Sequence, residues 1–176
     1  MFPAVEYRRC EPARRGVSPD IEPVRREYQG DPVKFENVVT ITRQPAEVFE
    51  YLARFENVPR WNYAISETRK LTRGPVGVGT RYRQTRTVPS PTTEEFEVVE
   101  IETDRRLVVV GDLASLHGRV TYELSGGDGM TKLANLMDLT APPPLGLLAH
   151  LATRSIRSSV AANLSVLKDQ LERSSR

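Results

Sequence analysis

The chain has 176 residues, of which 39% are apolar and 27% are charged, and this balance suits one globular domain with a core of ordinary size. No apolar run approaches the roughly 20 residues that a membrane-spanning helix needs, and no secretory signal follows Met1. We therefore expect a cytoplasmic protein without an integral membrane segment. The net charge is only +2, and basic residues do not interleave with aromatic ones as in a nucleic-acid-binding surface, so we expect no nucleic-acid partner.

Residues 1–33 differ in composition from the rest of the chain. They contain five prolines and six arginines in three pairs, balanced by six acidic residues, with few large apolar side chains. Such a segment cannot bury enough apolar surface to offset the entropy that it would lose on ordering. We expect an extended or disordered N-terminal arm, followed by one domain over residues 34–173. Docking of a protein partner on the arginine pairs is an alternative role for the arm.

Residues 38–71 predict a strand, two short helices and a second strand. Apolar residues alternate with threonines up to residue 42, and Pro45 then stands at a favoured first position of a helix. A second short helix is expected around Pro59, because proline interrupts a helix but is tolerated in its first turn. The glycines of residues 74–80 (GPVGVGT) supply the next turn.

The following part of the chain predicts strands in antiparallel succession. Together with the strand before Pro45, seven are expected, and the later six lie at residues 65–71, 80–88, 93–102, 107–113, 116–124 and 131–140. Pairing the first hairpin about its proline-rich turn places Gln84 opposite Phe96. Pairing the second about residues 114–115 places Asp112 opposite His117, either as a surface ion pair or as a catalytic dyad.

Residues 146–172 predict one long amphipathic helix after a triple proline. Its second half carries bulky residues at helical spacing, which we expect to pack as solid core: Leu164, Leu167 and Leu171. Its first half continues the same stripe with smaller residues, which we expect to border a cavity: Leu148, Ala152 and Ile156.

Five short motifs, in this order, resemble those of one superfamily: residues 45–52 (PAEVFEYL), 59–61 (PRW), 74–80 (GPVGVGT), 105–107 (RRL) and 163–168 (NLSVLK). The chain resembles the START-like superfamily, and within it the polyketide cyclase/dehydrase and lipid-transport group, which shares the helix-grip fold of birch-pollen-allergen-like proteins. The resemblance covers about residues 35–173. It implies an α+β fold in which a seven-stranded curved antiparallel sheet wraps around a long C-terminal helix, with two short helices between strands 1 and 2.

The resemblance also implies a deep cavity between the sheet and the terminal helix. The expected strand faces then assign these ligand-binding residues: Trp61, Tyr82, Gln84, Phe96, Val98, Val109, Tyr122, Asn135 and Met137, together with Leu148, Ala152 and Ile156 of the helix. The alternative is that these side chains pack against one another as ordinary core. Gln84 and Asn135 are the more telling pair, because a buried amide needs hydrogen-bond partners and a ligand can be one of them.

The first functional hypothesis is a carrier or sensor of a small hydrophobic molecule of the lipid, polyketide or isoprenoid type. It is favoured by an apolar cavity wall with few polar groups, the usual composition of a ligand pocket. No metal or other cofactor is expected, because two histidines and one cysteine offer no ligand cluster.

The second hypothesis is a polyketide cyclase or dehydratase acting in the same cavity. Cyclases of the superfamily hold their substrate with a tryptophan, which Trp61 matches, and with an arginine on the fourth strand, whose place falls on Glu100 or Ile101. Arg86 is the candidate substitute, unless it simply pairs with Glu94 across the strands. Tyr122 or Glu100 would then transfer protons.

Overall fold

A curved antiparallel sheet, crossed on its inner face by one long helix, makes up most of the described chain. The computed structural model describes residues 32–113, 116–140 and 146–173. Its strands are β1 (Pro32–Ile41), β2 (Ile65–Lys70), β3 (Arg81–Arg86), β4 (Thr92–Glu102), β5 (Arg106–Leu113), β6 (Leu116–Gly127) and β7 (Met130–Thr140). Its helices are α1 (Pro45–Ala53), the 3-10 helix η1 (Phe55–Asn57), α2 (Val58–Trp61) and α3 (Gly146–Arg173).

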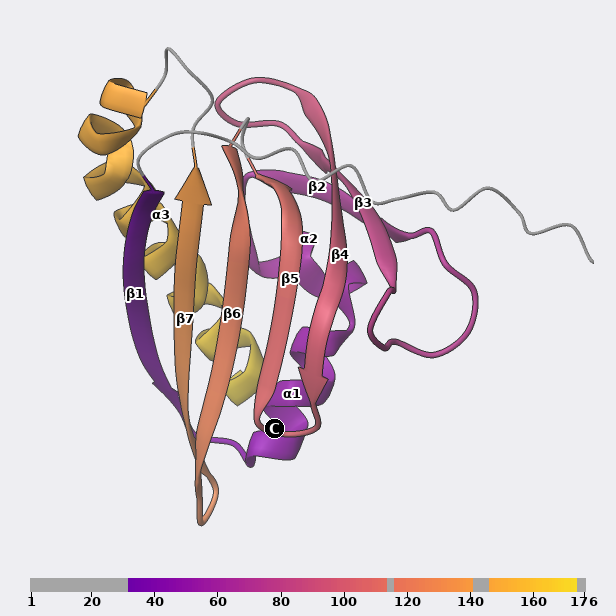
Figure 1. Ribbon diagram of the computed structural model, residues 1–176. Helices are drawn as coiled ribbons and strands as arrows, with labels where there is room; N and C mark the ends of the chain where they lie inside the picture. The colour runs from indigo at the N-terminus through magenta and orange to yellow at the C-terminus, as the bar shows by residue number, and fades with distance from the viewer. Residues whose placement is uncertain (1–31, 114–115, 141–145, 174–176) are drawn as a thin grey trace, which may run out of the picture.

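The strands lie in the order β1-β7-β6-β5-β4-β3-β2, and every neighbouring pair is antiparallel. In Figure 1, α3 (yellow) runs behind the sheet, and α1 and α2 (purple) lie on the same side of it. This arrangement confirms the predicted helix-grip fold of the α+β class. The expected N-terminal arm and residues 141–145, which include the triple proline before α3, lie outside the described residues.

The core fills the space between the sheet and the second half of α3. Leu164, Leu167 and Leu171 are at most 6% exposed, which confirms the prediction that the later leucines of this helix pack as core. α1 adds its own apolar stripe to the same cluster, with Val48 and Leu52 buried. The first turn of α1 begins where Pro45 predicted it, because the Glu47 carboxylate accepts a hydrogen bond from the Gln44 N–H at 3.1 Å.

Arg43 fixes the C-terminal end of α3 to the end of β1. Its Nε donates to the Leu171 carbonyl at 2.8 Å, and its Nη2 donates to the Glu172 carbonyl at 3.1 Å. The last carbonyls of a helix have no partner within the helix, so the arginine satisfies two of them from outside. The end of α3 that packs as core is therefore tied to the sheet.

The two long hairpins differ in how well their register could be predicted. Asp112 pairs with His117, as expected, and their side chains meet at 3.0 Å on the exposed outer face. In the first hairpin the prediction was wrong by two residues, because Gln84 lies opposite Glu94 and not opposite Phe96. β3 ends at Arg86, and the next N–H, that of Thr87, bonds to the Ala64 carbonyl beside β2. A shift of two residues leaves every side chain on its expected face.

A bulge in β4 changes the alternation of its side chains. Val98 pairs with Val109, but Glu100 pairs with Val108, so that Val99 is an extra residue. After this bulge, the residues that would point inward in a regular strand point outward, so Glu100 lies on the outer side of the sheet.

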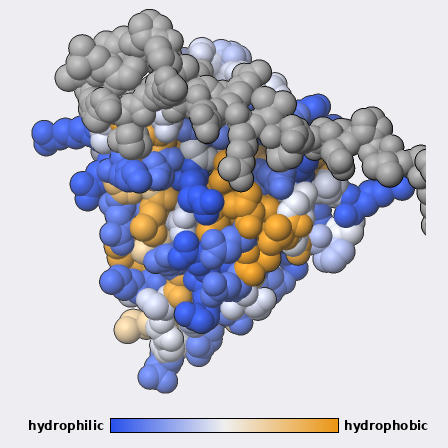
Figure 2. All heavy atoms as spheres, viewed as in Figure 1, coloured by the Kyte–Doolittle hydropathy of each residue, from blue (hydrophilic) through white to orange (hydrophobic). Residues whose placement is uncertain are grey.

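The outer face of the sheet is mainly hydrophilic, with apolar patches between charged groups, as Figure 2 shows. Ion pairs cross its strands, including Lys34 to Asp138 at 2.9 Å, and Arg81 and Arg83 to Glu95 at 2.8 and 2.7 Å. Within the part of the chain described, no helix combines the length and the apolarity needed to cross a bilayer.

Candidate ligand-binding cavity

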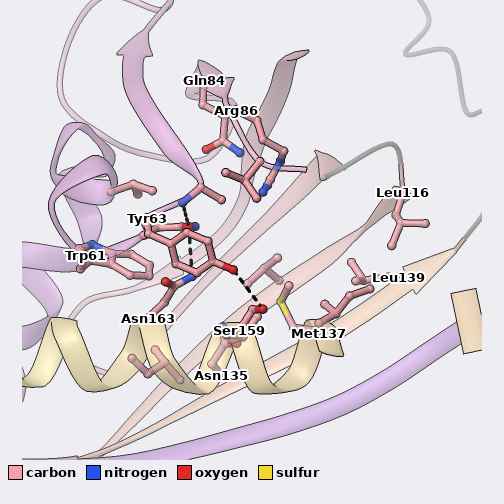
Figure 3. A pocket seen from close by; sticks show the side chains of 18 of the residues that line it. Trp61, Tyr63, Gln84, Arg86, Leu116, Asn135, Met137, Leu139, Ser159 and Asn163 are labelled. Carbon is pink, nitrogen blue, oxygen red and sulfur yellow. Dashed lines mark hydrogen bonds between the residues drawn. The ribbon is translucent and has the colours of Figure 1, made fainter. Parts of the chain in front are cut away.

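A cavity of about 360 Å³ lies between the inner face of the sheet, the segment around α2 and the middle of α3 (Figure 3). Its described lining includes these residues from the predicted site: Trp61, Gln84, Phe96, Val109, Tyr122, Asn135, Met137 and Ile156, with the catalytic candidate Arg86. The strands bring them together because alternate residues of β3 to β7 point to the concave side. That they contact a ligand stays a prediction.

Tyr82 and Val98 do not line this cavity, and their expected place in its wall is corrected. Both are fully buried in the core. The Tyr82 ring stacks on Phe96, with centroids 5.3 Å apart, and contacts Phe55 at 4.9 Å. Phe55 belongs to η1, so this short helix occupies the space over the end of the sheet that the sequence analysis had assigned to the cavity. Leu148 and Ala152 belong to the part of α3 whose side chains lie outside the described residues.

A buried carboxylate lies beside the cavity on the inner face of β4. The Glu94 side chain is 2% exposed, and its Oε1 accepts a hydrogen bond from Arg86 Nε at 2.5 Å. Its Oε2 accepts bonds from Gln84 Nε2 at 2.6 Å and from Arg86 Nη2 at 3.2 Å. The pairing of Arg86 with Glu94, the alternative left open by the sequence, is therefore present. It does not remove Arg86 from the cavity, because the arginine lines the wall at the same time.

Arg86 presents one edge of its guanidinium to Glu94. The two bonds use Nε and Nη2, and Nη1 bonds to no described residue. A paired guanidinium stays charged and oriented, so its remaining N–H groups suit a carbonyl, phenolate or carboxylate of a ligand.

Glu100, a candidate for proton transfer, is placed elsewhere. The bulge at Val99 turns it to the outer face, where it lies 2.8 Å from Arg106 and 4.0 Å from Arg119. Its proposed catalytic role in the cavity is therefore wrong. Ile101 has the inward position, so neither of the two residues aligned with the family's arginine supplies an inward charge.

Tyr122 lies on β6 directly opposite Asn135 of β7. Burial raises the pKa of the Tyr122 phenol well above its ordinary value, so this group is protonated at neutral pH. A protonated phenol at the cavity wall can donate a hydrogen bond but cannot act as a general base.

A polar stripe of α3 borders the cavity and was not predicted. Asn163 Nδ2 donates to Asn62 Oδ1 at 3.1 Å, and the Tyr63 hydroxyl bonds to Ser159 Oγ at 3.2 Å (Figure 3). Ser155, Ser159 and Asn163 recur every four residues in the sequence, which is the helical spacing that could have revealed them. Glu94 could likewise have been found, because it alternates with Phe96 and Val98 on the inner face.

With the geometry in place, the comparisons with known proteins decide the family. The family model described as polyketide cyclase / dehydrase and lipid transport matches residues 32–172. The chain belongs to this family. The START-like resemblance inferred from the sequence is thereby confirmed. Among curated proteins, none matches this sequence.

Solved structures share the fold at low identity. The di-domain aromatase/cyclase StfQ of the steffimycin biosynthetic pathway has a TM-score of 0.67 at 16% identity over 81% of this chain, which spans 51% of that protein. The ZhuI aromatase/cyclase of Streptomyces sp. R1128 has a TM-score of 0.67 at 15% identity, over 83% of this chain and 97% of its own. A START superfamily protein of Mycobacterium smegmatis has 0.64 at 15% identity, over 78% and 98%. At this identity the likeness establishes the fold alone.

Proposed function

We propose that this protein binds a small hydrophobic molecule of the lipid, polyketide or isoprenoid type in the cavity between the sheet and α3, as a carrier or sensor in the cytoplasm. The observation that carries the proposal is the cavity itself. Its volume of about 360 Å³ lies in the range of small-molecule sites, and its wall is mainly apolar with a few convergent polar groups. Membership of a family named for lipid transport and polyketide chemistry supports it.

Native mass spectrometry of the gently purified protein tests binding directly. A co-purifying hydrophobic species, or saturable uptake of the fluorescent amine N-phenylnaphthylamine that such a species displaces, is the expected result. A protein that carries no ligand and takes up no fluorescent amine would contradict the proposal.

A cyclase or dehydratase activity in the same cavity is the second candidate, and it is favoured by the position of Arg86 and Tyr122 in the wall. Both groups are hydrogen-bond donors at neutral pH, so together they could stabilise the negative charge of an enolate formed from a polyketide-like substrate. Three of the structures similar to this one, StfQ and ZhuI among them, carry the name aromatase/cyclase, which describes those proteins.

The two candidates differ in their dependence on the Tyr122 hydroxyl. A synthetic poly-β-ketothioester that loses water in the presence of the wild-type protein, and not with Tyr122→Phe, would identify the enzyme. Binding of the same compound without turnover, equal in both proteins, would identify the carrier. The Tyr63→Phe variant is the control, because it removes a phenol at the exposed side of the same cavity.

A further inference from the structure

The cavity wall contains a buried hydrogen-bond acceptor without a partner. Asn135 lines the cavity and is 2% exposed, yet its Oδ1 accepts no hydrogen bond from any described residue. Leaving a buried carbonyl oxygen unsatisfied destabilises a fold, and such groups are uncommon in native proteins. An amide retained there despite this cost indicates a partner that is bound from outside the chain.

The strand neighbours of Asn135 do not supply that partner. Tyr122 pairs with it from β6 but does not donate to its Oδ1, and Asn37 pairs with it from β1, where the Asn37 amide instead donates to the Arg157 carbonyl at 3.4 Å. Met137, the next inward residue on β7, is apolar and also lines the cavity. Since no described residue donates to Asn135 Oδ1, we expect its donor to come from a molecule in the cavity.

A second polar atom without a bond to the described residues, Arg86 Nη1, belongs to the opposite wall of the cavity. Arg86 is on β3, and three strands separate β3 from the β7 strand of Asn135. At about 4.8 Å per strand the two positions are about 19 Å apart along the sheet, and its curvature brings them closer across the cavity. Figure 3 shows Arg86 on the upper side of the cavity and Asn135 on the lower side.

We propose that the ligand is an elongated apolar molecule with a polar group at each end: a hydroxyl that donates to Asn135 Oδ1, and an acceptor or anion that faces Arg86 Nη1. This inference rests on the proposed function, and it narrows the ligand class. A simple fatty acid has one polar end and would leave Asn135 unsatisfied, whereas a hydroxylated polycyclic or chain-hydroxylated acid satisfies both walls.

Three matched compounds test the assignment by calorimetry. Each is a biphenyl with a carboxylate at one para end, and the other para end carries a hydroxyl, its methyl ether or hydrogen. The hydroxyl compound is expected to bind the wild-type protein about tenfold more tightly than the ether, because only the hydroxyl can donate to Asn135. In Asn135→Leu, which keeps the bulk and removes the acceptor, this preference should fall below about twofold. The control Val166→Leu, on the exposed face of α3, should retain it.

The unliganded variant gives a second readout. Asn135→Leu should melt at or above the temperature of the wild-type protein, since it removes an unsatisfied group, whereas an amide with a structural role would lower the melting temperature when lost. If Asn135→Leu does not fold, the Asn135→Ala variant is used for both the binding preference and the melting temperature.

The outcomes separate this inference from the proposed function. Equal binding of the three compounds by the wild-type protein, or a hydroxyl preference that survives in Asn135→Leu and Asn135→Ala, would overturn the inference. Failure of all three compounds in a protein that still takes up N-phenylnaphthylamine would also overturn it and leave the binding function intact. Failure of N-phenylnaphthylamine as well would reject the binding function itself.

Discussion

Glu94 and Arg86 form an ion pair beside the cavity, with 2.5 Å between Glu94 Oε1 and Arg86 Nε, and their side chains are only 2% and 13% exposed. A buried pair of this kind contributes little when compared with an apolar pair, but removing one partner leaves the other charge uncompensated. The pair thus makes the fold depend on an arginine that also lines the cavity.

Glu94→Ala should lower the free energy of unfolding by about 3 to 5 kcal/mol, because it leaves the Arg86 guanidinium buried without its counter-charge. The neighbouring Glu95→Ala is the control. It breaks surface pairs with Arg81 and Arg83 and should cost no more than about 1 kcal/mol. Urea unfolding of the two variants measures the difference, and equal losses would show that the buried position of Glu94 has no energetic consequence.

Tyr82→Phe should leave stability at neutral pH unchanged or raise it by about 1 kcal/mol, because the buried Tyr82 hydroxyl has no hydrogen-bond partner in the described structure. Burial, with a smaller contribution from the Glu56 charge, raises the pKa of Tyr82 from 10.0 to about 12. Because the folded state holds the Tyr82 phenol in its neutral form, the protein keeps its full stability below pH 10. It loses stability as the phenol of the unfolded chain ionises above pH 10, until the pH passes about 12.

Thermal unfolding between pH 9 and pH 12, set around that pKa, should therefore show a steeper alkaline loss in the wild-type protein than in Tyr82→Phe. Parallel curves for the two proteins would contradict the raised pKa of Tyr82.

Leu167→Ala should lower the free energy of unfolding by about 2 to 5 kcal/mol, since Leu167 is fully buried between α3 and the sheet. Its sequence neighbour Val166 is 43% exposed, so Val166→Ala should change stability by about 0.5 kcal/mol or less. Denaturant midpoints at matched slopes give both values. A silent Leu167→Ala would place the core on another face of α3.

Val160→Trp should block uptake of N-phenylnaphthylamine with little change in melting temperature, because Val160 lines the cavity and the larger ring has the empty volume to occupy. Val166→Trp places the same side chain on the exposed face of α3 and should leave uptake unchanged. If both variants bind the amine as the wild-type protein does, the amine binds outside this cavity. The sequence-based expectation that Ala152→Trp has the same effect stays a prediction.

Most of the fold was predictable because local patterns and turn lengths determine it. The second hairpin has only residues 114–115 between its strands, and so short a connection leaves one register, which the pairing of Asp112 with His117 confirms. The first hairpin has five residues, 87–91, between its strands. That length permits several registers, so the sequence alone does not select the one in which Gln84 lies opposite Glu94.

The sequence predicted which face of the sheet carries the site residues, but it did not predict the shape of the cavity. Alternation correctly put Gln84, Tyr122 and Asn135 on the concave side, but whether such a residue meets a cavity or the core depends on what packs against it. Tyr82 meets Phe55 of η1, a contact between residues far apart in the chain, and so it became core. Periodicity carries no information on contacts of this kind.

The bulge at Val99 has a consequence for how this cavity can change its chemistry. Two residues of β4 oppose one position of β5 at this point, so the positions that follow have exchanged sides. If Val99 were lost, Glu100 would follow Val98 directly in a regular ladder, so it would stay on the outer face and Ile101 on the inner face. Loss of a single codon at this point would thus straighten β4 without placing an acid group in the cavity wall.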